Sequence, residues 1–354
     1  MKPAIIHDKN RVSLKPERKT DFRLWIFFGL ATVTLCAVFI SNLSLGATSI
    51  PIHDVTGALF GPDTDNYNQI IVHYQRLPRT LIAIYVGAVM ASGGVILQTL
   101  TRNPLASTST LGTNAGASLF VVGGAFLFDF GVEAQGLAAL AGAFFGFFCC
   151  LSVARMAGRS NDPRGLSLIL SGVLVSMLFV AITNAFLLSN PMKRSEFLGW
   201  VTGNINHAYI DRLSDFWWIG LLSLLTLFLT ARPLTLLLLG TEKAQSAGVN
   251  VKGITRIALA ATLLGSGSAV AICGPVGFIG LIVPHMVRPF VGNNVLSLLA
   301  ASVLVGAVVC LIADMGARLF FQPYILHTGL FMDLIGGVVF AFIVKRVYLA
   351  RAAL

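Results

Sequence analysis

The sequence is short of charge. Asp, Glu, Lys and Arg make up only 11% of its 354 residues, whereas 56% are hydrophobic and the mean hydropathy is +0.81. Too little polar surface is available to cover a water-soluble globule of this size. This scarcity excludes an ordinary soluble protein and predicts a polytopic membrane protein.

Metal-binding and disulfide patterns are also lacking. The five cysteines all lie inside apolar runs without metal-ligand spacing, and we interpret them as small packing residues: Cys36, Cys149, Cys150, Cys273 and Cys310. His285 has no second ligand at helical spacing, so packing is favoured over a proton relay or a metal site. We therefore expect no metal bound by this chain.

The motifs of nucleotide chemistry and catalysis are missing as well. The chain has no G-x-x-x-x-G-K-[ST] phosphate loop, and no convincing set of nucleophile, base and orienting acid. Ser266 and Ser268, in GSGSA, are typical of residues that let helices approach closely. We expect neither an enzyme nor a bound cofactor, so that any ATP and Mg²⁺ would be used by a separate protein.

What the sequence does have is long apolar runs. Residues 1–22 form a polar, basic tail, and the run that follows is too long for the core of a signal peptide, so we interpret it as an uncleaved first helix. The sequence predicts an all-α protein in which 23–354 form a single transmembrane domain of about ten helices. They are expected at Leu24–Leu45, Thr80–Leu100, Leu111–Phe128, Leu137–Ala154, Leu166–Leu188, Phe216–Ala231, Ile254–Ile272, Val276–Val291, Val295–Ala313 and Thr328–Val344.

The basic residues predict the orientation. They are scattered at the ends of apolar runs, which does not resemble a nucleic-acid patch even though the net charge is +10. With both termini in the cytoplasm, most of the 25 Lys and Arg fall on the inner side, as the positive-inside rule requires. The outer side keeps only Arg76, Arg79, Lys193, Arg194, Arg212 and Arg318.

Four sequence blocks resemble one family. They are RLPR at 76–79 with RNPLA at 102–106, the E-x-A-x-x-x-G pattern of Glu242, Ala244 and Gly248, GPVGFIGLIVPHMVR at 274–288, and LIADMGAR at 311–318. In the third block, glycines three residues apart offer a face for close helix approach, and Pro284 is expected to interrupt the helix. The blocks are similar to those of permease subunits of type II ABC importers for ferric siderophores, haem and vitamin B12.

The resemblance implies partners. Such permeases work in the bacterial inner membrane as a homodimer or a pair of permease subunits, in contact with membrane lipid, a cytoplasmic ABC ATPase dimer and a periplasmic substrate-binding protein. It implies ATPase coupling through 240–253, with Glu242, Ala244, Gly248 and Val249. It implies that the binding protein docks on Arg76, Arg79 and Arg318. The alternative is that these arginines cap neighbouring helices or contact lipid headgroups. A ferric siderophore is the expected cargo, with haem and vitamin B12 as alternatives.

The resemblance also concerns the translocation path and the cargo. In the resembling family the fifth and tenth spans line the path, and the fifth span offers Ser167, Ser171, Ser176, Thr183 and Asn184, which could equally bond neighbouring helices. Before the last span the family's P-x-E-L-P-x-G is replaced by Pro323 to Gly329, and Asp333 follows within the span. An ion-coupled secondary transporter is the rival from another class, and it would need buried acids near mid-membrane.

Overall fold

The computed structural model describes residues 18–46, 48–61, 63, 65–156, 166–206, 209–321 and 326–345, and every regular element in these ranges is a helix. In chain order they are α1 (Arg18–Ser44), α2 (Ile52–Phe60), α3 (Tyr67–Ile71), the π-helical turn η1 (Val72–Arg76), α4 (Leu77–Thr101), the 3₁₀ turn η2 (Ser109–Leu111), α5 (Thr113–Phe128), α6 (Val132–Met156), α7 (Leu166–Ser189), α8 (Pro191–Val201), α9 (Ile210–Leu238), α10 (Thr241–Ser246), α11 (Val251–Cys273), α12 (Ile279–Val291), α13 (Val295–Leu319) and α14 (Thr328–Val344).

The apolar helices coincide with the predicted runs. Among the described residues, 7 helices are long and apolar enough to cross a membrane: α1, α4 with its preceding turns, α6, α7, α9, α11 and α13. The apolar helices α5, α12 and α14 are shorter. The helical class is therefore confirmed, whereas ten full crossings and the cytoplasmic position of the termini stay predictions. Most of the basic tail, 1–22, lies outside the described residues.

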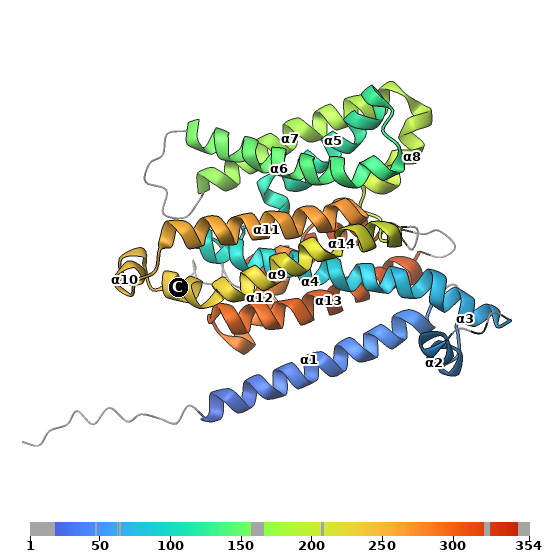
Figure 1. Ribbon diagram of the computed structural model, residues 1–354, viewed down its shortest axis with the longest axis horizontal. Helices are drawn as coiled ribbons and strands as arrows, with labels where there is room; N and C mark the ends of the chain where they lie inside the picture. Colours follow the sequence, from blue (N-terminus) through green and yellow to red (C-terminus); the bar gives the residue numbers. More distant parts are fainter. Residues whose placement is uncertain are drawn as a thin grey trace, which may run out of the picture.

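The helices form two packed groups (Figure 1). Helices α5, α6 and α7 pack against one another, and α11 joins them to a second group in which α4 contacts α9, α11, α12 and α13. Helix α1 lies along α13 on the outside of this group. The short helices α2, α3 and α8 lie at one end of the bundle, the α2 end, and α10 lies at the other, the α10 end (Figure 1).

Glycine-to-glycine contacts place α4 at the centre. A Cβ atom on Gly87 would collide with the carbonyl of Gly306 in α13, and one on Gly94 would collide with the carbonyl of Gly280 in α12. Lipid tails are as apolar as leucine, so helices in a membrane gain association energy from close backbone packing. The small residues of α4 therefore let it contact several helices at once, and it is the most deeply buried candidate span.

Two non-helical segments enter the bundle. Arg102 ends α4 in the left-handed conformation (φ 49°), and the chain from there to α5 buries Ala106 and Leu111 completely. A second segment, 274–278, separates α11 from α12. The predicted start of a helix at Val276 is therefore wrong, and Gly274 and Gly277 precede the helix instead of lining a face of it. Irregular backbone at membrane depth occurs where it is enclosed by protein or lines a cavity.

Proline does not interrupt α12, contrary to the sequence prediction. The helix runs from Ile279 to Val291 through Pro284 and Pro289. Proline cannot donate to the carbonyl four residues earlier, which for Pro284 is that of Gly280. The Gln98 side chain of α4 donates to the carbonyls of Gly280 and Leu281, each at 3.3 Å. A neighbouring helix thus satisfies the carbonyl that the proline leaves free.

The α4–α13 contact makes a prediction. Gly87→Val should destabilise the protein by about 1 to 3 kcal/mol, because the added carbons overpack a contact between backbones. Gly29→Val on α1 is the matched control, since a Cβ atom there meets nothing within 4 Å. Thermal unfolding in detergent should show a lower Tm for the Gly87 variant alone. Equal Tm values would contradict the close approach.

Candidate functional site

A buried carboxylate organises the α2 end of the bundle. Asp314 of α13 is fully buried, and its two oxygens accept hydrogen bonds from Nε of Arg79 at 2.9 and 3.1 Å. The Arg318 Nε atom lies 3.2 Å from Asp314 Oδ2, one helical turn along α13. The Thr328 hydroxyl at the start of α14 donates to Oδ1 at 2.9 Å. Two cations and a hydroxyl thus surround one buried acid.

Asn42 extends this network to α1. Its side-chain oxygen accepts from Arg318 Nη2 at 2.7 Å and from the Thr80 hydroxyl at 3.0 Å, and its amide donates to the carbonyl of Leu311 at 3.1 Å. Bonds between polar side chains therefore join α1, α4, α13 and α14 at one level. Buried polar bonds of this kind favour one arrangement of the helices that they join.

Arg76 caps the end of α1. Its guanidinium donates to the carbonyls of Leu43 at 2.8 Å, Ser44 at 2.7 Å and Thr48 at 2.6 Å. The last carbonyls of a helix have no partner within the helix, so this arginine supplies donors where they are needed. Its side chain is largely buried, which leaves little of it on the surface.

The structure thus brings the three predicted docking arginines together, and all three bond to the chain itself. Their contacts match helix capping and ion pairing within the protein, and docking of a binding protein stays a prediction. Arg79 and Arg318 keep 12% and 13% of their side chains exposed. The sequence analysis included Asp314 only as part of the LIADMGAR block, and it missed Asn42, since nothing local signals a partner over two hundred residues away.

His327 adds no charge to this cluster. Burial lowers its pKa, and the nearby positive charge of Arg79 lowers it further. The ring Nδ1 lies 3.0 Å from the Thr202 hydroxyl, which joins the start of α14 to the end of α8. The neutral form is therefore favoured at physiological pH, and the cluster holds three guanidinium groups against one carboxylate.

At the α10 end, the predicted coupling segment is a short helix ended by glycine. Ala244 is completely buried, and Val249 is half-buried with its N–H donating to the carbonyl of Ala244 at 3.0 Å. Glu242 and Gly248 are exposed, and Gly248 is left-handed (φ 80°). The two apolar residues therefore fasten the segment to the bundle while the other two project from it.

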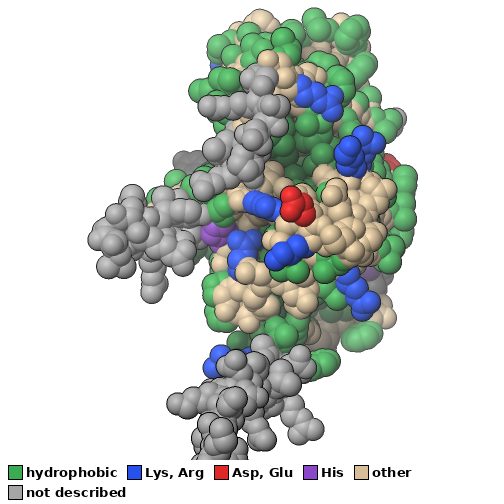
Figure 2. All heavy atoms as spheres, turned by 90° about the vertical axis from the view of Figure 1, so that its left-hand side faces the viewer, with side chains coloured by type: hydrophobic (Ala, Val, Ile, Leu, Met, Phe, Trp, Pro, Cys, Tyr) green, Lys and Arg blue, Asp and Glu red, His purple; other side chains and the backbone are tan. Residues whose placement is uncertain are grey.

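Basic side chains surround this projection. Figure 2 looks at the α10 end and shows Lys and Arg side chains spread around an acidic one. A cavity of about 970 Å³ also lies at this end, and its lining includes residues of α4, the end of α9 and α12, among them His285 and Arg288. Among the described residues no group of three His, Cys, Asp or Glu could hold a metal ion.

The predicted path residues of α7 do not share one environment. Ser171 and Thr183 are buried within the subunit, and the Thr183 hydroxyl donates to the carbonyl of Phe179 in its own helix at 2.8 Å. Ser167 and Ser176 are half-buried, whereas Asn184 is exposed. The structure therefore does not gather the five into one polar face, and their role in a path stays a prediction.

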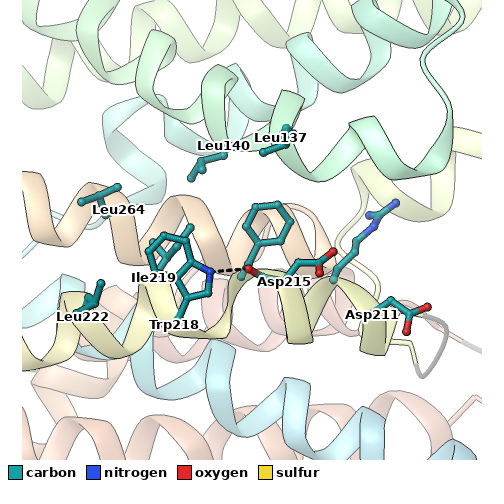
Figure 3. Close-up of a pocket in the computed structure, with 10 residues that line it drawn as sticks. Leu137, Leu140, Asp211, Asp215, Trp218, Ile219, Leu222 and Leu264 are labelled. Atoms are coloured by element: carbon teal, nitrogen blue, oxygen red, sulfur yellow. Dashed lines mark hydrogen bonds between the residues drawn. The ribbon is translucent and has the colours of Figure 1, made fainter.

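A largely apolar cavity of about 710 Å³ lies between α6, α9 and α11. Figure 3 shows Leu137 and Leu140 of α6 facing Trp218 and Ile219 of α9, with Asp215 toward the start of α9. The Trp218 indole N–H donates to the backbone carbonyl of Asp215 at 2.7 Å. Such a lining suits hydrocarbon better than a water-soluble chelate.

Comparison with known proteins identifies the family of this chain. Residues 34–346 match the model of the FecCD transport family. The chain belongs to this family. It is thus an ABC transporter permease subunit and not an enzyme, as the sequence analysis predicted.

The relatives of this FecCD permease are aligned over almost their full length. It is 34% identical to the Fe(3+)-citrate import system permease protein YfmD of Bacillus subtilis, over 93% of this chain and 97% of that protein. It is also 34% identical to the ferric enterobactin transport system permease protein FepD of Escherichia coli, over 90% and 94%. A solved inward-facing conformation of a metal-chelate type ABC transporter superposes with a TM-score of 0.74 and 28% identity, covering 91% of this chain and 99% of that one.

The Asp314 network makes a prediction for this permease. Asp314→Asn should cost about 3 to 5 kcal/mol, because it leaves two buried guanidinium groups without their counter-charge. Asp129→Asn is the control, since it removes an ion pair between Lys193 and a carboxylate that is 84% exposed, and should cost at most about 1 kcal/mol. Chemical unfolding of the purified subunits would measure both. Equal losses of unfolding free energy in the two variants would contradict a larger contribution from the buried ion pair.

Proposed function

We propose that this permease carries a ferric siderophore from the periplasm to the cytoplasm across the bacterial inner membrane, driven by ATP hydrolysed on a partner. The observation that carries the proposal is the near full-length similarity to permeases whose names specify ferric citrate and ferric enterobactin. Haem and vitamin B12 are the alternative cargoes within the same family.

The shape of the α10 end supports an ATPase as its partner. We propose that a cytoplasmic ABC ATPase dimer receives α10, which fixes the α10 end and both termini in the cytoplasm. The projecting residues Glu242 and Gly248 would enter a cleft of that protein, while buried Ala244 transmits the displacement to α9. A short helix fastened to a long one moves with it as a body.

The charge of the α2 end supports a partner there. Arg76, Arg79 and Arg318 outnumber the one carboxylate among them, and we propose that the excess attracts acidic groups of a periplasmic binding protein. Arginine suits this role because its charge persists at all physiological pH values. The internal bonds of these residues would then position the charge instead of competing with docking.

The rival, an ion-coupled secondary transporter, requires an intramembrane acid that binds and releases a cation. Asp314 does not suit this role, because two guanidinium groups neutralise it permanently. Asp314 therefore gives this rival no support.

A reconstituted assay separates the two mechanisms. Proteoliposomes holding the permease pair and its ATPase, with binding protein and ⁵⁵Fe-labelled chelates outside, should accumulate iron only when ATP is enclosed. A Lys→Ala change in the phosphate loop of the ATPase should abolish uptake, and a protonophore should leave it unchanged. Uptake that follows the proton gradient without ATP would contradict the proposal.

The coupling segment is tested with two substitutions at one position. Gly248→Trp should prevent ATPase binding because the side chain projects from the bundle into the space assigned to the partner. Gly248→Asn is the control, since asparagine tolerates the left-handed conformation without adding such bulk. Co-purification with the ATPase should be lost for the tryptophan variant and kept for the asparagine variant. Intact binding by both would exclude docking at this segment.

Docking at the α2 end predicts opposite effects for two substitutions. Removing a cation by Arg79→Gln should slow association with the binding protein, whereas removing the acid by Asp314→Asn should hasten it, each by about 2- to 10-fold at low salt. Stopped-flow association on folded complexes in nanodiscs would measure both rates. If both variants associate more slowly, the cluster only supports the fold.

A further inference from the structure

The two non-helical segments and α14 enclose a polar cavity of about 430 Å³. Its polar lining comes from the segment around η2, from the end of α8 and from α14: Ser107, Ser109, Thr110, Asn114, Thr202 and Asp333. Discontinuous helices that expose backbone and polar side chains at membrane depth are a recurrent way of building transport sites. None of the α7 residues predicted for the path lines it.

Three of the four hydroxyl hydrogens around this cavity are used within the protein. Thr110 donates to the carbonyl of Ser107 at 2.8 Å, and Thr202 donates to that of Leu198 at 2.8 Å. The hydroxyls of Ser107 and Ser109 share one hydrogen bond of 2.9 Å. Hydroxyl groups whose hydrogens are engaged present their lone pairs. The cavity therefore offers mainly acceptors.

Two further acceptors have no donor. Within the described part of the chain, no hydrogen bond or ion pair involves the Asp333 carboxylate, which lies against Gly277 so closely that a Cβ atom there would collide with it. The Asn114 amide donates to the carbonyl of Val276 at 3.3 Å, while its buried oxygen has no partner. Exchanging the amide atoms would not help, because the Val276 carbonyl is itself an acceptor.

The Asn114 oxygen is a buried acceptor without a partner, which is costly, and a guest that brings a donor removes this cost. Asp333 is exposed on the cavity wall, so its charge is accessible to a guest. A bare metal ion does not fit, since only one carboxylate is present and metal sites for hard cations gather several oxygen ligands. A chelate with a protonated amine supplies both the charge and the hydrogens. A polycarboxylate chelate supplies neither and would be repelled.

We propose that this cavity is a cargo subsite, in which Asp333 and Asn114 favour ferric chelates that carry an ammonium group over neutral or anionic ones. Asp333 forms the ion pair, and the Asn114 oxygen accepts a second hydrogen of the same group. The inference rests on the proposed import of ferric chelates and specifies the charge of the cargo.

A matched pair of cargoes tests this directly. Ferrioxamine B ends in a free ammonium group, and its N-acetylated form has the same ferric trihydroxamate without that charge. Competition for uptake between the two, labelled with ⁵⁵Fe and ⁵⁹Fe, gives a preference ratio in proteoliposomes of the complete transporter. Because binding protein and ATPase are unchanged between variants, a change in the ratio reports on the permease alone.

Asp333→Asn should lower the ratio of ammonium to acetylated cargo by about tenfold, the scale of one lost ion pair in a partly enclosed site. Asn114→Asp, which adds a second carboxylate, should raise it. Asp129→Asn, remote from the cavity and exposed, should leave it unchanged. The opposite signs of the two cavity variants separate charge recognition from a general loss of folding.

The inference fails if neither cavity variant changes the ratio, or if wild-type transporter takes up ferric citrate in preference to both hydroxamates. Those results would leave ferric-chelate import standing. If the wild-type transporter takes up no ferric chelate at all, the proposed function and the subsite fail together.

Discussion

Close packing of backbone against backbone around α4 is the constraint on which the rest of the structure depends. Gly87 and Gly94 bring this helix against α13 and α12 at distances that no side chain would permit. Because α4 also contacts α9 and α11, its position sets that of half the bundle. At one end the Asp314 network fixes α4 to α1, α13 and α14, and at the other Arg102 ends the helix and turns the chain inward.

That inward turn gives the bundle its polar interior. The 102–112 and 274–278 segments can be irregular because protein encloses them. Within α12, Gln98 of α4 supplies the hydrogen bond that the Gly280 carbonyl lacks. The same arrangement leaves a few acceptors, notably Asp333 and the Asn114 oxygen, facing a cavity. A chain with 11% charged residues thus places one acid, Asp333, in the lining of this cavity and another, Asp314, where it holds helices together.

The sequence predicted the parts of this molecule that depend on composition and local pattern. Apolar length located the helices, because a run of apolar residues and the helix that it predicts occupy the same stretch of chain. It failed where the cause is remote. Pro284 was expected to break α12, and only the fold brings Gln98 to the freed carbonyl. The partners of Arg79 and Arg76 likewise lie in other helices, so the sequence could not show that these arginines bond within the chain.

The central claim is that one end of this bundle engages an ATPase while its interior receives the chelate. A cryo-electron microscopy structure of the complete transporter in nanodiscs, trapped with a non-hydrolysable ATP analogue and ferrioxamine B, tests it most directly. The account predicts α10 within a cleft of the ATPase and chelate density against Asp333 and Asn114. An α10 that touches no partner, or a chelate held away from this cavity, would contradict it.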